Sequence, residues 1–175
     1  MIEPNPFSLP AVRFRNTETV DLDYVLAAEE NEENRLFIIP WTRDEHSRRL
    51  IDPNCAHLVV EAETRVGYVI LFGLRDPHKS IEFRRIIITE KGHGFGIATV
   101  LQLQKLAFEN YDAHRLWLDV KVQNHRARSV YEKAGFTVEG ILRECLRSRD
   151  RYESLVVMSI LKQEYEAQNR ITALS

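Results

Sequence analysis

The stretch Lys91-Gly92-His93-Gly94-Phe95-Gly96-Ile97-Ala98-Thr99 decides the fold, because it turns a strand into a helix. Before it, residues 81–89 are rich in β-branched side chains and predict a strand. After it, the apolar spacing of residues 97–109 predicts a helix, and residues 116–118 predict another strand. Strand, helix and strand in this order predict a right-handed crossover between two parallel strands.

The pattern on either side of this unit predicts hairpins. Strands are expected at residues 11–16, 56–62, 66–74, 136–143 and 155–161, and helices at 19–31, from 42 to before Pro53, and at 124–134. Thr19 is a candidate N-cap for the first helix, and Gly135 suits the left-handed residue that ends the last one. We therefore expect a mixed α/β (α+β) fold whose central sheet is mixed and mostly antiparallel.

Length and composition bound the class of protein. The 175 residues, 44% of them hydrophobic, predict a single domain over residues 1–175 with a core at about 11–165, and they exclude a disordered chain. The longest apolar run, residues 68–72, is far shorter than the ~20 residues that cross a membrane. Residues 1–6 do not have the pattern of a secretory signal, so we expect a cytoplasmic protein with no membrane partner.

Metal and nucleic-acid partners are not expected. Cys55 and Cys145 are too far apart for a disulfide framework or a zinc knuckle, and the histidines do not have metal-ligand spacing. An isoelectric point near 6.3 without a basic-aromatic stripe argues against nucleic-acid binding.

A net charge of −2 hides two regions of opposite charge. Residues 17–34 contain seven acids and no Lys or Arg, whereas residues 113–151 contain nine basic residues and five acids. Solvated faces explain either region. The alternative is an anionic ligand at one end of the molecule and a cationic ligand at the other.

The glycines between the strand and the helix predict an anion site, since backbone N–H groups and the helix dipole point at the same place. A tight turn without a ligand is the alternative. A P-loop is excluded because no Lys-Ser or Lys-Thr follows the glycines. A dinucleotide site fits only in part: Gly94 and Gly96 begin its pattern and Asp119 could supply its acid, but Thr99 stands at the third glycine position.

A third interpretation accounts for more residues. The segment from His93 to Ala98 resembles the Q/R-x-x-G-x-G/A pyrophosphate loop of the GNAT superfamily of acetyl-CoA-dependent N-acetyltransferases, with His93 where Gln or Arg is usual. Asn124-x-x-Ala127-x-x-x-Tyr131-x-x-x-Gly135-Phe136 resembles that superfamily's second cofactor segment. The resemblance spans residues 11 to about 165, and the tail is most similar to the branch of ribosomal-protein alanine and spermidine/spermine acetyltransferases.

This resemblance implies a single domain whose sheet is splayed around a β-α-β site for acetyl-CoA, the acetyl donor. It implies that one strand pairs with pantetheine, that the glycine turn cradles the pyrophosphate, and that the second segment completes the site. The residues implied are Ile86, Ile87 and Ile88, then His93, Gly94, Phe95, Gly96, Ile97, Ala98 and Thr99, and then Asn124, Arg128 and Tyr131. Solvated positions remain the alternative for Arg126 and Arg128.

The resemblance also implies direct attack of an amine on the thioester in a ternary complex. Tyr131 is the expected general acid for the leaving thiolate, with a core aromatic residue as its alternative. Glu82 is the expected base, acting through a water molecule, with an ion pair to Arg84 or Arg85 as its alternative.

On the acceptor side, Glu29 and Glu33 are expected to bind the amine, which could be a polyamine, another small amine or a protein N-terminus. A homodimer is expected from the resemblance alone. The competing function is a non-catalytic acyl-CoA-binding module of the same fold. The presence of both Tyr131 and Glu82 favours the enzyme, because binding requires neither.

Overall fold

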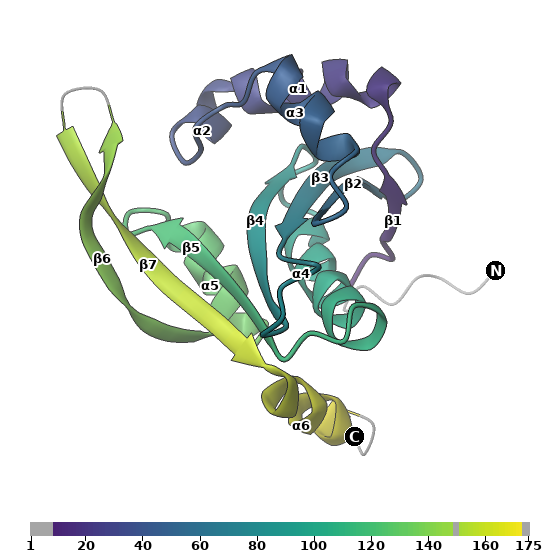
Figure 1. The fold of residues 1–175 in the computed structure, drawn as a ribbon, viewed down its shortest axis with the longest axis vertical. Coiled ribbons are helices and arrows are strands. Elements are labelled where there is room, and N and C mark those ends of the chain that lie inside the picture. Colours follow the sequence, from purple (N-terminus) through teal and green to yellow (C-terminus); the bar gives the residue numbers. More distant parts are fainter. Residues whose placement is uncertain (1–8, 149–150, 173–175) are drawn as a thin grey trace.

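A single seven-stranded sheet organises the protein, for which a computed structural model describes residues 9–148 and 151–172 (Figure 1). The strands are β1 (Arg13–Asn16), β2 (Cys55–Glu61), β3 (Arg65–Phe72), β4 (Ser80–Ile88), β5 (Arg115–Lys121), β6 (Thr137–Ser148) and β7 (Arg151–Leu161). Their order in the sheet is β1-β2-β3-β4-β5-β7-β6. Of the neighbouring pairs, β4 and β5 are parallel and the others antiparallel, which confirms the predicted mixed, mostly antiparallel sheet.

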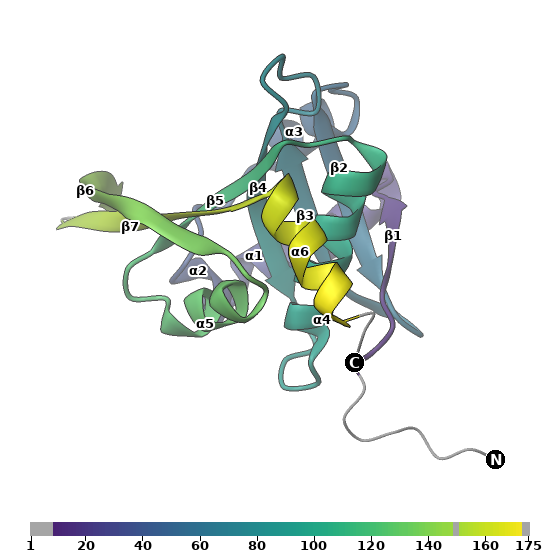
Figure 2. The ribbon, with the colours of Figure 1, turned by 90° about the horizontal axis from the view of Figure 1, so that it is seen from below.

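Helices cover both faces of the sheet. They are η1 (Thr19–Asp21), α1 (Leu22–Glu30), α2 (Glu32–Arg35), α3 (Arg43–Leu50), α4 (Phe95–Lys105), the π-helical turn η2 (Leu106–Asn110), α5 (His125–Lys133) and α6 (Lys162–Thr172). One core cluster joins α4, α5 and α6 to the sheet, and a second joins α1 to β3 and β4. Figure 2, seen from below, shows α4, α5 and α6 in front and α1 and α2 fainter behind them.

The parallel pair is short, and this positions the functional site. Strands β4 and β5 pair only where residues 80–82 face residues 115–117. Beyond this point β4 continues to Ile88 with β3 as its partner, while β5 continues to Lys121 with β7 as its partner. The sheet therefore opens into two halves between the middle strands.

A β-bulge reverses the alternation of side chains along β4. Ile70 of β3 faces Arg85 and the next residue, Leu71, faces Phe83, so Arg84 has no partner in β3. Phe83 consequently packs in the cluster with α4, whereas Ile87 packs in the cluster with α1. Bulges of this kind redirect side chains next to functional sites.

Several predicted boundaries were wrong. Thr19 is not the N-cap, because Glu18 precedes η1 and its N–H donates to the Asp21 carboxylate at 2.9 Å. The first helix ends at Glu30 and is followed by the separate α2. The final hairpin is longer than predicted. The prediction missed its outer part because β6 is exposed along most of its length and has none of the apolar alternation of a half-buried strand.

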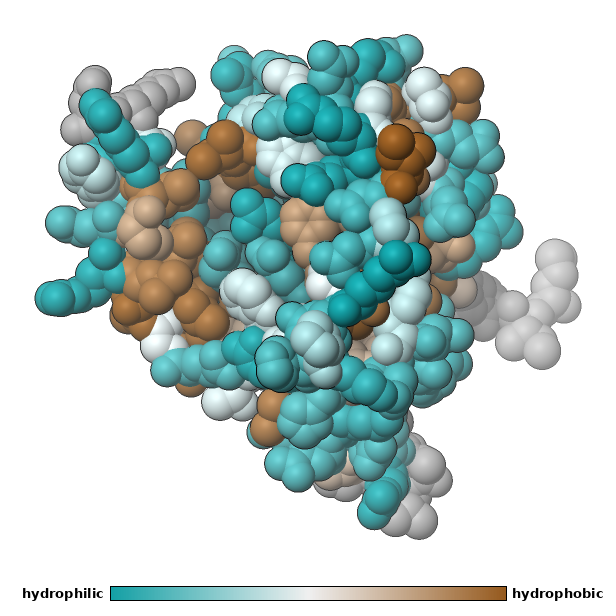
Figure 3. Space-filling model, in the orientation of Figure 1, coloured by the Kyte–Doolittle hydropathy of each residue, from teal (hydrophilic) through white to brown (hydrophobic). Residues whose placement is uncertain are grey.

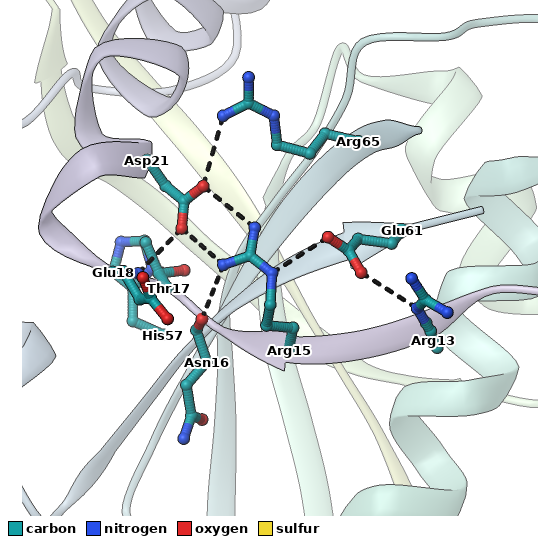
Figure 4. Close-up of polar contacts among 9 residues, drawn as sticks. All are labelled: Arg13, Arg15, Asn16, Thr17, Glu18, Asp21, His57, Glu61 and Arg65. Atoms are coloured by element: carbon teal, nitrogen blue, oxygen red, sulfur yellow. Dashed lines mark hydrogen bonds and ion pairs between the residues drawn. The ribbon is translucent and has the colours of Figure 1, made fainter. Parts of the chain in front are cut away.

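An ion-pair network ties the start of the chain to the sheet (Figure 4). Arg15 of β1 lies between two carboxylates, with Nη1 at 2.7 Å from Asp21 and Nε at 3.0 Å from Glu61. The hydrogen bond from Arg15 lowers the pKa of Asp21 to about 2. The network thus joins β1, η1 and β2, and it uses one member of the acidic run for structure.

Candidate active site

A cavity of about 920 Å³ opens where β4 and β5 separate. Strand β4, the glycine turn, the first turns of α4 and α5, and the end of β5 line it on one side. Residues 33–41 and the β6–β7 hairpin complete it. Its volume is within the roughly 300–1,000 Å³ of small-molecule sites.

Most of the residues expected to bind the cofactor line this cavity. They are Ile86, Ile87, Ile88, Gly94, Phe95, Gly96, Ile97, Asn124 and Tyr131. The structure places His93, Ala98, Thr99 and Arg128 outside the lining. Helical periodicity accounts for two of these, since Ala98 and Thr99 face the core with exposures of 7% and 0%. Arg126, two residues before Arg128, lines the cavity.

The cavity exposes an edge of β4. Between Phe83 and Ile88 this strand has its antiparallel partner β3 on one side, and no strand of the described residues pairs with it on the side toward β5. An unpaired strand edge offers N–H and C=O groups to an extended ligand that contains amides. The splay therefore creates a binding surface without requiring particular side chains.

The glycine turn leads from this edge to the N-terminus of α4. Gly92 and Gly94 have φ values of +89° and +79°, which an L side chain rarely adopts, and Gly94 is the N-cap residue. A Cβ on Gly96 would meet nothing within 4 Å, so an open cradle lies beside the first helical N–H groups. This arrangement fits an anion such as a pyrophosphate.

Alanine at two of these glycines is expected to change stability in opposite directions. Gly96→Ala should stabilise the fold by roughly 0.5–1 kcal/mol, because Gly96 is helical and its surroundings are open. Gly94→Ala should destabilise it by about 1–2 kcal/mol, because the residue is left-handed and its Cβ would lie 3.2 Å from Pro10.

Gly96→Ala should also raise the Kd of coenzyme A about tenfold, since its Cβ enters the open cradle, whereas Gly94→Ala should change the Kd less, since its Cβ points toward Pro10. Thermal unfolding and calorimetric titration measure the two effects separately. An unchanged Kd in Gly96→Ala would place the phosphates elsewhere.

Asn124 combines a structural and a binding role. Its Oδ1 accepts a hydrogen bond from Ala127 N at 3.2 Å and so caps α5. The residue also lines the cavity, where its amide nitrogen remains available as a donor.

Tyr131 lies at the inner end of the cavity. The residue is 7% exposed, and its ring lies 6.0 Å from that of Phe83, edge to face, and 5.9 Å from that of Phe136. Burial raises the pKa of its phenol, and the negative charge of Asp119 raises it further. The phenol therefore keeps its proton at neutral pH and can donate it.

Glu82 occupies a different environment from Tyr131. It does not line the cavity, and its Oε1 accepts a hydrogen bond from Arg84 Nη1 at 2.9 Å. The ion pair considered as its alternative role is thus present. Its role as a base stays a prediction.

The two acids expected on the acceptor side have separate surroundings. Glu29 is 0% exposed, and its carboxylate accepts hydrogen bonds from Arg85, Tyr68 and, at 2.7 Å, Trp41 N. This burial leaves Glu29 no surface with which to contact an amine. Glu33 lines the cavity and forms an ion pair with Lys91.

Most of the acidic run is paired rather than free. The pairs are Asp21 with Arg15, Asp23 with Arg43, Glu29 with Arg85, Glu30 with Arg35, and Glu33 with Lys91. Five of the seven acids counted in the sequence therefore have a cationic partner.

Residues 36–41 form a cavity wall that the sequence analysis missed. Buried cations from both halves of the sheet hold its backbone: Arg85 donates to Ile39 O at 2.8 Å, and Lys121 donates to Leu36 O at 2.9 Å. The Arg85 guanidinium also lies 4.4 Å from the centre of the Trp41 ring. The signal was the apolar sequence Leu-Phe-Ile-Ile-Pro-Trp in a loop, where polar residues are usual.

The described part of the chain has neither a metal-binding cluster nor a membrane-spanning helix. No group of three His, Cys, Asp or Glu side chains among residues 9–148 and 151–172 is arranged to hold a metal ion. In the same ranges, no helix has the length and apolar character to span a membrane.

Comparison with known proteins identifies this architecture. The family model of the acetyltransferase (GNAT) domain matches residues 11–137. The spermidine N(1)-acetyltransferase of Escherichia coli strain K12 is 29% identical, with 93% of this chain and 92% of that protein aligned. A Bacillus subtilis protein, named as a candidate alanine N-acetyltransferase of ribosomal protein bS18, is 30% identical over 73% of this chain and 82% of that protein.

The fold has solved counterparts. The spermidine N-acetyltransferase of Vibrio cholerae, whose crystal structure contains CoA and spermine, matches with a TM-score of 0.80 and 28% identity. The match covers 89% of this chain and 98% of that chain.

Proposed function

Because the chain belongs to the GNAT family of acetyl-CoA-dependent N-acetyltransferases, we propose that it acetylates a primary amine by direct attack in a ternary complex. One observation carries this proposal. The open edge of β4, the glycine turn and Tyr131 all border one cavity, so a thioester, its phosphates and a proton donor can meet there.

The donor is bound by groups that suit its parts. The free N–H and C=O groups beyond Phe83 pair with the amides of pantetheine, and one N–H polarises the thioester carbonyl. The turn from Gly92 to Gly96 and the α4 N-terminus hold the pyrophosphate, while Asn124 donates to the pantetheine arm.

The proton balance of the transfer defines the groups required. An alkylamine has a pKa of about 10, so a base must first remove one proton from its ammonium form. The nitrogen lone pair then forms the C–N bond as the C–S bond breaks. Tyr131 gives its phenol proton to the departing sulfur, and the second nitrogen proton returns to the phenolate. The products are the N-acetyl amide, coenzyme A and one released proton.

Relatives suggest acceptors to test first. The E. coli and V. cholerae proteins are named for spermidine, and the B. subtilis protein for a ribosomal-protein alanine. Glu33 lies on the cavity wall where an amine would enter, although Lys91 neutralises it. The homodimer, the cytoplasmic location and the absence of nucleic-acid and membrane partners stay predictions.

The test measures coenzyme A release from acetyl-CoA with spermidine, small monoamines, amino acids and peptides that begin with Ala or Ser. Calorimetry measures cofactor binding in parallel. Turnover with one amine class supports the enzyme. Tight binding without turnover on any amine favours the non-catalytic acyl-CoA-binding module, and no binding overturns both functions.

A further inference from the structure

The part of the cavity that faces away from the glycine turn has apolar walls. Leu36, Phe37 and Ile39 are 65%, 38% and 55% exposed and line one side. Leu146 and Leu155 of the β6–β7 hairpin line the opposite side. Figure 3 shows hydrophobic surface gathered along this hairpin, with a further patch toward α2. A ligand between these walls makes mostly apolar contacts.

The charged side chains that line this part of the cavity are mainly cations. They are Arg84, Arg85 and Lys121. Their carboxylate partners are Glu82, Glu29 and Glu153, respectively, and none of these lines the cavity. Carboxylates outside the cavity therefore neutralise these cations, and a cationic ligand in the cavity cannot contact those carboxylates.

Asp119 is the exception. It lies on β5 two residues beyond Trp117, the last residue paired with β4, and it is exposed toward the cavity. No ion pair or hydrogen bond to its carboxylate is found within residues 9–148 and 151–172. Desolvation of the carboxyl by the surrounding protein raises the pKa of Asp119, and the positive charge of Arg84 opposes this effect. Of the other lining acids, Glu33 is paired with Lys91, and Glu90 directly precedes the glycine turn.

We propose that the acceptor is a monoamine on an apolar body, and that Asp119 binds its ammonium group and accepts its first proton. This inference rests on the proposed acetyltransferase activity and specifies its substrate class. A single carboxylate satisfies one ammonium, and apolar walls favour the hydrocarbon attached to it. A polyamine would place its further ammonium groups against these apolar walls, without partners.

Asp119 takes the proton step in place of Glu82, which is paired with Arg84 and does not line the cavity. Asp119 and Tyr131 line the same cavity, and the charge of Asp119 acts on the phenol of Tyr131. The ammonium proton passes to Asp119, the free amine attacks the thioester, and Tyr131 protonates the sulfur. The second nitrogen proton then returns to the Tyr131 phenolate, and Asp119 releases its proton to solvent, which balances the reaction.

The first test compares two acceptors that differ in a single group. n-Hexylamine and hexane-1,6-diamine have the same chain, but the diamine has a second ammonium at the far end. We expect kcat/KM with acetyl-CoA to be at least about tenfold higher for hexylamine, and spermidine to resemble the diamine. Equal or better turnover of the diamine or spermidine would overturn the inference while leaving the acetyltransferase intact. No turnover on any amine would overturn the proposed activity and this inference with it.

The second test concerns Asp119 itself. Asp119→Asn should raise the KM for hexylamine about 30-fold or more and leave the Kd of acetyl-CoA unchanged, and Asp119→Glu should restore part of the loss. Asp44→Asn, the same change at an exposed position of α3 outside the cavity, should have no effect. An unchanged KM in Asp119→Asn would contradict the assignment.

A variant that should gain activity on diamines tests, independently of Asp119, whether the apolar walls contact the body of the amine. Ile39→Glu places a second carboxylate on the apolar wall, at a side chain that is 55% exposed. The ratio of kcat/KM for diamine over hexylamine should rise at least about fivefold in this variant. No change in the ratio would show that the amine body does not pass this wall.

Discussion

Replacing Tyr131 by phenylalanine is expected to lower kcat about 100- to 1,000-fold and to leave the Kd of acetyl-CoA unchanged. The variant removes only the hydroxyl group and keeps the ring, so the packing against Phe83 and Phe136 persists. Without the phenol proton, the thiolate must leave as an anion in a site that burial has made poor in water. Steady-state kinetics and calorimetry of the same preparation provide both numbers.

The pH dependence of the wild-type enzyme follows from the same residue. Burial raises the pKa of Tyr131 above its usual value of 10, so the phenol stays protonated throughout the neutral range. The general acid therefore causes no loss of kcat below about pH 10. A decline of kcat between pH 7 and 9 that disappears in Tyr131→Phe would contradict this reasoning.

Tyr165→Phe is the matched control. Tyr165 is a buried tyrosine of α6 whose hydroxyl donates to Glu109 at 2.6 Å, outside the cavity. Its loss should destabilise the protein by about 1 kcal/mol without changing kcat. If kcat in Tyr131→Phe equals that of the wild type, Tyr131 is a core aromatic residue and another group protonates the sulfur.

The parts of the fold that depend on local chemistry were predictable from the sequence. Glycines between a strand and a helix predicted the turn at residues 91–96, and Gly135 was predicted to end α5 with a positive φ, which is +87°. The β2–β3 hairpin and the parallel pair also followed from periodicity. These features arise from neighbours along the chain.

The acceptor side was not predictable in this way, because it depends on partners far apart in sequence. Glu29 belonged to an acidic run, but its guanidinium partner is 56 residues away in Arg85. Asp119 drew attention only as part of an incomplete dinucleotide pattern, although the divergence of β4 and β5 exposes it in the cavity. Which acids are free and which are paired is a tertiary property.

Loss of the buried carboxylate in Glu29→Gln is expected to destabilise the protein by about 3–5 kcal/mol, because it leaves the Arg85 cation buried without its partner. The neighbouring Glu30→Gln is the control: Glu30 is 61% exposed on its side chain, pairs with Arg35 at the surface, and should change stability by less than about 1 kcal/mol. Urea unfolding at neutral pH measures both.

The pH dependence of stability gives an independent signature of Glu29. Burial alone would raise its pKa, but the contact with His46 Nε2 at 3.2 Å and the charge of Arg85 outweigh burial and lower it from 4.5 to about 2. Because the folded value is the lower one, the carboxylate stabilises the fold above about pH 4.5, and this contribution is lost as the pH falls toward 2. Wild-type stability should fall in this range by on the order of 3 kcal/mol more than that of Glu29→Gln.

The ion pair of Glu29 and Arg85 also holds the cavity wall formed by residues 36–41, and a double variant separates this role from stability. Glu29 accepts from Trp41 N at 2.7 Å and Arg85 donates to Ile39 O at 2.8 Å, so both fix the backbone of residues 36–41. Glu29→Leu combined with Arg85→Met removes the pair as a unit and should recover part of the stability, since no buried charge is left unpaired. The recovery should be incomplete, because the Tyr68 hydroxyl and Trp41 N lose their acceptor and Ile39 O loses its donor. It should not restore the wall, so the acceptor KM should be about tenfold above that of the wild type, while the KM of acetyl-CoA should equal that of the wild type. A wild-type acceptor KM would show that the pair serves folding alone.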